Sequence, residues 1–162
     1  MAGGVNNIGN LPGSSMTAGN YTPQHVAIVD SSGNLMEFAG SGTVWTALHV
    51  PSANTQATIT KAAAGAGIRN ICTGFTVTLA AGTTAPAAVQ LTVMLVDGAS
   101  GGTSYLWRSV ICLPATAGAV TAFVRSGMLI PGSANTAMTL EFSAAGGANT
   151  FESVSMDGTT GT

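Results

Sequence analysis

Few side chains in this sequence have the chemistry that catalysis needs, and they lie far apart along the chain. A serine nucleophile requires a base within reach, and the chain has only two histidines, His25 and His49, so we expect no serine to form a nucleophile elbow. Glu141 and Glu152 could supply a carboxylate pair for acid–base chemistry, but solvent-facing charges that keep strand edges soluble explain them more simply. The sequence therefore predicts a protein that is not an enzyme and has no catalytic residues.

Charged side chains are scarce throughout the chain. Four Lys and Arg and six Asp and Glu among 162 residues give a net charge of −2 and amount to about a quarter of the usual share. Four scattered cations form no basic patch, so the sequence predicts no binding of nucleic acid. A free monomer normally carries many charges of both signs, whereas an exterior of Thr, Ser, Asn, Ala and Gly suits a protein that packs against other subunits. We therefore expect a building block of an assembly.

No motif in the chain points to a metal, a cofactor or a membrane. Cys72 and Cys112 lack the Cys/His spacing of a zinc site, and we expect both to be buried free thiols, with a disulfide as the alternative. Neither a phosphate-binding loop nor a dinucleotide fingerprint is present, so no cofactor is predicted. No apolar run approaches the roughly twenty residues that cross a bilayer, and the first residues lack the pattern of a signal peptide. We therefore expect synthesis in a cytoplasm.

The first 44 residues differ in composition from the rest of the chain. Residues 1–24 are dominated by Gly, Asn, Ser, Thr and Pro without periodicity, which predicts an extended arm that a neighbouring subunit or a larger assembly must hold in place. Residues 25–30 and 35–38 predict the two strands of a small β-hairpin with Gly and Asn at its turn. We interpret residues 1–44 as a segment for attachment and assembly.

Residues 45–162 have the regular strand spacing of a β-sandwich. Met138, Leu140 and Phe142 alternate with polar residues, which predicts a strand with one buried and one solvent-facing side. Helix is poorly supported, because glycines interrupt the stretch with helical propensity at 61–64. We expect an all-β chain whose antiparallel β-sandwich is of the jelly-roll or immunoglobulin-like type, with a short barrel also compatible. The expected strands, separated by Gly-rich turns, are 43–50, 56–61, 68–79, 88–97, 104–112, 119–125, 137–143 and 151–157.

Aromatic side chains are candidates for contact with a partner. Tyr21, Trp45, Tyr105 and Trp107 could form a contact surface or stack on sugars, because flat rings deliver a large buried area at low entropic cost. Arg108 follows Trp107 in the same expected strand and completes this set of possible interface residues. Core packing is the alternative, and for Trp107 we favour the core or a subunit interface over ligand recognition.

Several turn and strand motifs resemble those of small virion proteins of tailed bacteriophages. The resemblance covers about residues 45–157, and its motifs are residues 67–74, 96–102 continuing into 106–108, 126–127 and 132–143. It implies a structural component of the virion, such as a capsid decoration (cement) protein, a head fibre or a tail accessory. It implies no catalytic residues.

Together these observations predict a capsid decoration protein on the outer surface of a bacteriophage head. The resemblance implies that its partner is the major capsid protein, and we expect residues 1–44 to engage that lattice while the sandwich forms a homo-oligomer, a trimer in our interpretation. The alternative is a tail or fibre module that binds host surface sugars through Tyr105, Trp107 or Trp45.

Overall fold

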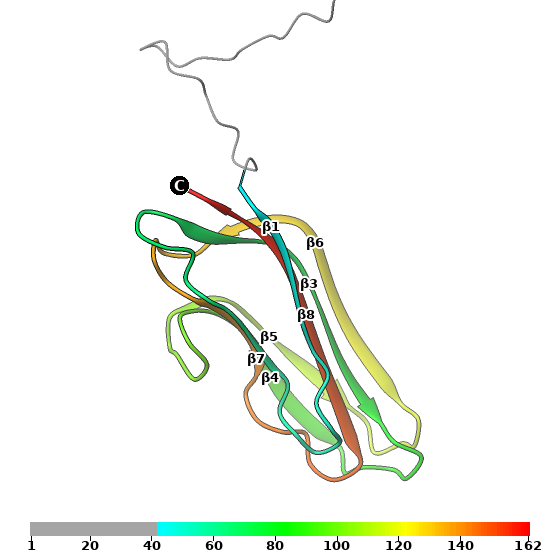
Figure 1. Cartoon of the computed structure of the whole chain (residues 1–162). Helices are drawn as coiled ribbons and strands as arrows, with labels where there is room; N and C mark the ends of the chain where they lie inside the picture. The colour runs from blue at the N-terminus through cyan, green and yellow to red at the C-terminus, as the bar shows by residue number, and fades with distance from the viewer. Residues whose placement is uncertain (1–41) are drawn as a thin grey trace, which may run out of the picture. The chain divides into compact units, whose positions relative to one another are not determined.

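The computed structural model describes residues 42–162, which form two antiparallel sheets of four strands each (Figure 1). The strands are β1 (Val44–His49), β2 (Thr58–Lys61), β3 (Arg69–Ala81), β4 (Val89–Asp97), β5 (Tyr105–Leu113), β6 (Val120–Pro131), β7 (Met138–Phe142) and β8 (Thr150–Gly161). This part of the chain contains no helix, and so none that could cross a membrane. The predicted all-β sandwich is confirmed, whereas the predicted arm and hairpin lie outside the described residues.

The order of the strands identifies the sandwich as a jelly roll. Sheet one has the order β1-β8-β3-β6, and sheet two has the order β2-β7-β4-β5. The first four strands therefore pair with the last four in reverse: β1 with β8, β2 with β7, β3 with β6 and β4 with β5. This long ribbon is rolled up so that β8 also meets β3 and β7 also meets β4. The result is the eight-strand jelly roll and not the seven-strand immunoglobulin order.

The core lies between the two sheets and follows from alternation along the strands. Phe75, Val77 and Leu79 of β3 point inward, as do Leu140 and Phe142 of β7, and each is at most 1% exposed. Burying a side chain of this size contributes about 1.5–3 kcal/mol before the entropy of ordering it is subtracted. The sequence predicts that Leu140 and Phe142 share the buried side of their strand, and the structure confirms this part of the prediction.

The strand β6 extends well beyond the predicted end at residue 125 because a glycine bends it without ending it. Gly127 has a φ of +67°, a conformation that costs glycine little, and the pairing of β6 with β3 stops at Ser126 and resumes at Ile130. On the partner strand the register shifts between Cys72 and Gly74. Ser126 and Gly127 thus lie at an irregularity inside a long strand.

Candidate functional site

The carboxylate of Glu141 is buried on the outer face of sheet two, where the sequence predicts a solvent-facing charge. Its side chain is only 1% exposed, because the loop between β4 and β5 folds over it. The Gly101 amide donates to Oε1 at 2.9 Å, and the Ser100 hydroxyl donates to Oε2. The Thr58 hydroxyl also donates to Oε2, at 3.4 Å. The predicted wet side of β7 is therefore wrong, since a loop from elsewhere in the chain covers it.

The same loop is anchored a second time next to Glu141. The Thr139 hydroxyl donates to the carbonyl of Gly98 at 2.7 Å and lies 2.9 Å from the hydroxyl of Thr60. Thr139 is fully buried although it points away from the core. Two polar side chains of β7 thus hold the β4–β5 loop across the outer face of sheet two.

Residues 98–102 read Gly-Ala-Ser-Gly-Gly, which has the spacing of the Gly-x-Ser-x-Gly motif around a hydrolase nucleophile. Sequence reasoning passed over this match, and its structural context is different, because the segment joins two strands rather than a strand and a helix. Ser100 donates to Glu141, and His49 instead accepts a hydrogen bond from the Thr58 amide at 3.1 Å through Nδ1. The described residues therefore assemble no serine–histidine pair at this loop.

Glu152 is the second buried carboxylate, and its predicted solvent-facing position is also wrong. Its side chain is 2% exposed and accepts the amides of Ala57 at 2.7 Å and Gly146 at 2.6 Å, one on each oxygen. Burial raises the pKa of Glu152 above its ordinary value, and the hydrogen bonds from Ala57 and Gly146 partly oppose this rise. Glu152 ties the β1–β2 connection to the β7–β8 loop. It shares no donor with Glu141, so the two glutamates do not work as a pair.

The two tryptophans belong to the interior of the sandwich. Trp45 is 6% exposed and lies over Gly158, whose position leaves no room for a side chain beside the indole. Trp107 is half-buried, and its ring centroid lies 4.8 Å from that of Phe75 and 5.2 Å from that of Phe123. Trp107 thus packs β5 of one sheet against β3 and β6 of the other, which is one of the two roles, core or subunit interface, favoured from the sequence.

The remaining candidate interface residues lie on the surface or outside the described chain. Tyr105 is 43% exposed, and the Arg108 guanidinium lies 5.5 Å from the centre of its ring. Tyr21 precedes the described residues. Of the five residues predicted to contact a partner, the structure brings Tyr105 and Arg108 together at the surface and places Trp45 and Trp107 elsewhere.

The two cysteines have different surroundings. Cys72 is buried as predicted, its thiol donates to the carbonyl of Gly74 at 3.4 Å, and burial raises its pKa to about 11. Cys112 is exposed, so the prediction of a second buried thiol is wrong; it shares the outward side of the edge strand β5 with Arg108. Both thiols are free, so the alternative of a disulfide between them is not realised.

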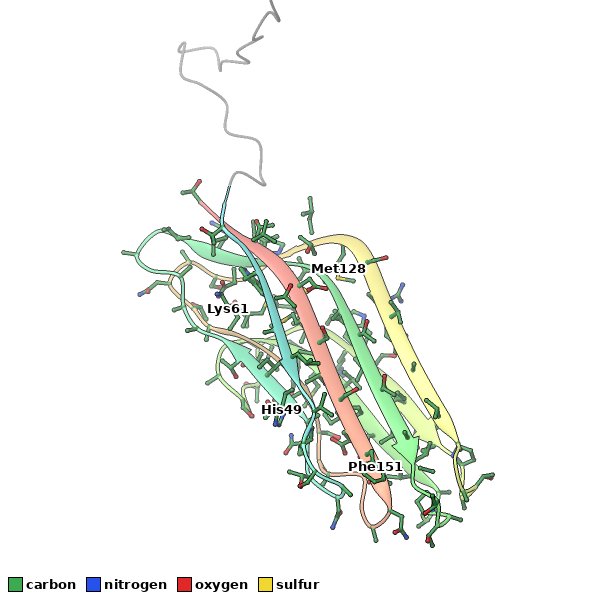
Figure 2. All side chains as sticks on the ribbon, turned by 45° about the vertical axis from the view of Figure 1, so that its right-hand side comes forward. His49, Lys61, Met128 and Phe151 are labelled. Carbon is green, nitrogen blue, oxygen red and sulfur yellow. The ribbon has the colours of Figure 1, made fainter. Side chains whose placement is uncertain are left out.

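Nothing within residues 42–162 covers the outer face of sheet one, which is almost without charge, and we call it the open face (Figure 2). Asp157 is the only acidic or basic residue on this face, and its side chain accepts a hydrogen bond from the Thr46 hydroxyl at 2.7 Å. Five of its apolar side chains are exposed large hydrophobics, with Phe151 near the lower end of the sheet in Figure 2. The open face consists of Val44, Thr46, Leu48, Thr76, Thr78, Ala80, Val120, Ala122, Val124, Phe151, Ser153, Ser155 and Asp157.

The described residues contain no group of three or more His, Cys, Asp or Glu side chains that could hold a metal ion. Comparisons of the chain with protein-family models, curated proteins and solved structures find no match. The feature of the described residues that points to a partner is therefore a surface: the open face, with five exposed large hydrophobic side chains and a single carboxylate.

Proposed function

We propose that this protein is a structural component of a bacteriophage virion: a capsid decoration protein, homotrimeric, that binds the lattice of the major capsid protein on the outside of the head. The observation that carries the proposal is the open face, where Val44, Leu48, Val120, Val124 and Phe151 are exposed around a single carboxylate. Covering these exposed apolar side chains is favourable, and a face with a single carboxylate does not strongly repel a partner of either charge. The proposed role is structural and not catalytic.

The open face and the proposed attachment segment are continuous. Strand β1 contributes Val44 and Leu48 to the face, and the preceding residues 1–43 lead directly into it. The chain enters the sandwich at a fixed point, because Thr160 donates its amide to the Thr43 carbonyl at 3.1 Å and accepts the Thr43 amide through its hydroxyl at 3.1 Å. A lattice contact made by the first residues would thus tether the domain through β1, one of the four strands that carry the open face.

Binding to the assembled lattice would stabilise it by mass action. A ligand that binds only the mature lattice lowers its free energy by about 2.7 kcal/mol per site when present at one hundred times its Kd. Many sites on one particle add together, so weak single contacts suffice. The jelly-roll order is compatible with this role, but lectins and cupins share it, so it supports the proposal by analogy alone.

The proposal is tested on purified virions by counting copies of the protein per particle. We expect a number that matches the capsomer sites, and a much lower number would overturn a lattice-wide role. The double variant Leu48→Lys with Val124→Lys, which places two charges on the open face, should lower the occupancy at least tenfold. Ala88→Lys, at an exposed position in the β3–β4 connection, is the matched control and should bind as the wild type does.

A second candidate function is a tail or fibre module that binds host sugars. The contact between the exposed Tyr105 ring and Arg108 favours it, since such a pair can stack on a sugar and bond its hydroxyls. Tyr105→Ala would then lower adsorption of the phage to its host without changing the stability of the head. Labelled antibody on intact particles separates the two candidates by showing the head or the tail.

A further inference from the structure

Two side chains of sheet one hold the chain where β2, a strand of sheet two, begins. The amide of Ala57 donates to Oε2 of Glu152 at 2.7 Å, and the amide of Thr58 donates to Nδ1 of His49 at 3.1 Å. Glu152 belongs to β8, and His49 is the last residue of β1 (Figure 2). Both hydrogen bonds therefore cross from one sheet to the other, on two successive amides.

The same residues are also bonded within sheet two, independently of His49. The Phe142 amide of β7 donates to the carbonyl of Ala57 at 3.1 Å. The hydroxyl of Thr58 donates to Glu141, also on β7, at 3.4 Å. Loss of the His49 bond would therefore separate the Thr58 amide from β1 while β2 stays paired with β7.

The bond to His49 exists in only one protonation state of the imidazole. Nδ1 accepts a hydrogen bond only when the ring is neutral, with its proton on Nε2. A second proton, on Nδ1, turns this nitrogen into a donor, which then faces the N–H donor of Thr58. Histidine is the side chain that ordinarily changes its charge between pH 5 and 8, and His49 is the only histidine in residues 42–162.

We propose that the hydrogen bond between His49 and Thr58 is an acid-sensitive contact between the two sheets. Protonation of Nδ1 releases the Thr58 amide and loosens the connection between β1 and β2, residues 50–57. Residues 52–55 of this connection are exposed, so few packed side chains oppose its movement. The change at the contact is thus one proton, and the element that responds is one surface connection.

The charged groups near His49 come from the strands around β1. On β8, Glu152 points to the same interior as His49, and on β2 Lys61 does so from sheet two. Glu141 and Asp157 lie on the outer faces of the two sheets. Glu152 responds to pH in the opposite sense: burial raises its pKa, so acid favours the folded state at Glu152 and opposes it at His49.

This inference goes beyond the proposed structural role, because it concerns the response of the free protein to acid and is measured without virions. Strand β1 carries Val44 and Leu48 of the open face and follows directly on the proposed attachment segment. Acid would therefore act on the strand through which the domain is tethered. The number of copies on virions tests the structural role separately.

Hydrogen exchange of the full-length chain tests the contact at pH 7.5 and pH 5, after correction for the intrinsic dependence of exchange on pH. In the wild type, protection of the Thr58 amide should be at least tenfold lower at pH 5. The Val77 amide, in a strand paired on both sides, reports opening of the whole domain, and its protection should change less than about threefold.

His49→Asn is the matched variant, because its side-chain oxygen can take the place of Nδ1 and accepts at both pH values. Protection of the Thr58 amide should then be the same at pH 7.5 and pH 5. A variant that is unprotected at both pH values also supports the proposal, since Thr58 then depends on the acceptor of the wild type. Unchanged protection in the wild type, equal acid losses in both proteins, or an equal loss at Val77 overturns it.

Discussion

The outer faces of the two sheets have similar alternating sequences but different surroundings. On sheet two, Thr139 and Glu141 are covered by the β4–β5 loop, which hydrogen-bonds to both of them. On sheet one, the open face has nothing over it within the described chain, and its polar groups are mostly Ser and Thr hydroxyls. In the described chain, buried carboxylates thus fasten loops, whereas the open face has one carboxylate and no loop over it.

The largest effect should come from removing the carboxylate that holds the covering loop. Glu141→Ala leaves the Gly101 amide and the Ser100 and Thr58 hydroxyls without their acceptor, and should lower the free energy of unfolding by about 4 kcal/mol. Urea denaturation measures this loss. Glu141→Gln keeps one acceptor oxygen and should lose less. Equal losses for both variants would show that the charge and its donors do not hold the loop.

Substitutions on the inner side of sheet one should lower the free energy of unfolding more than substitutions on its outer side. A Cβ at position 158 would lie 2.2 Å from the Trp45 ring and 2.3 Å from the Ile71 carbonyl oxygen, so Gly158→Ala should destabilise the fold by about 3 kcal/mol. The neighbouring Asp157→Ala, on the open face, removes one exposed hydrogen bond to Thr46 and should cost less than about 1 kcal/mol. If thermal unfolding gave similar losses for both, the distinction between the two sides of β8 would fail.

The buried Glu152 should make stability depend on pH in a direction opposite to that of an exposed, ion-paired carboxylate. Burial raises its pKa, so the protonated form is favoured by folding. Its contribution is fully present below its ordinary pKa of 4.5 and is lost as pH rises through the raised pKa of the folded state. The difference in unfolding free energy between wild type and Glu152→Gln, measured by urea denaturation from pH 4 upward, should therefore change in favour of Glu152→Gln.

That pH series needs a control with an exposed carboxylate. Asp157→Asn serves this purpose, because Asp157 lies at the surface of the same strand. The free energies of unfolding of wild type and Glu152→Gln should not differ by a constant amount across the series, and the difference should not move in favour of the wild type as pH rises. Either result would contradict the claim that burial is the dominant influence on the pKa of Glu152.

The sequence predicts the strands of this fold well because alternation is local. Phe75, Val77 and Leu79 mark the inner side of β3 within five residues of chain. The cover over Glu141 was missed, since it comes from a loop forty residues earlier, and alternation gives only the side on which a residue lies. Strand order was likewise beyond reach, because both sheets are formed by strands from opposite ends of the chain.

The candidate site shows the same limit at the level of single residues. Trp45 is suited by type to an interface, and only its position opposite Gly158 makes it a core residue. Cys112 was expected to be buried because its neighbours are apolar. It is an even number of residues from Arg108 in β5, so both side chains point to the outward side of this edge strand. The match of residues 98–102 to a hydrolase motif could have been found from its spacing alone. The expected strand after it would then have argued against a nucleophile, because that motif joins a strand to a helix.

The smallest expected effect tests the open face itself. Val124→Thr replaces a methyl group by a hydroxyl on a side chain that is 63% exposed, and should change the free energy of unfolding by less than about 0.5 kcal/mol. Val77→Thr makes the same change at a fully buried position on the neighbouring strand and should cost about 1–3 kcal/mol, because the hydroxyl loses its water. Urea denaturation of both variants at the same low protein concentration measures these changes. If Val124→Thr costs as much as Val77→Thr under these conditions, the open face is covered even in the dilute protein, and the contrast with sheet two disappears.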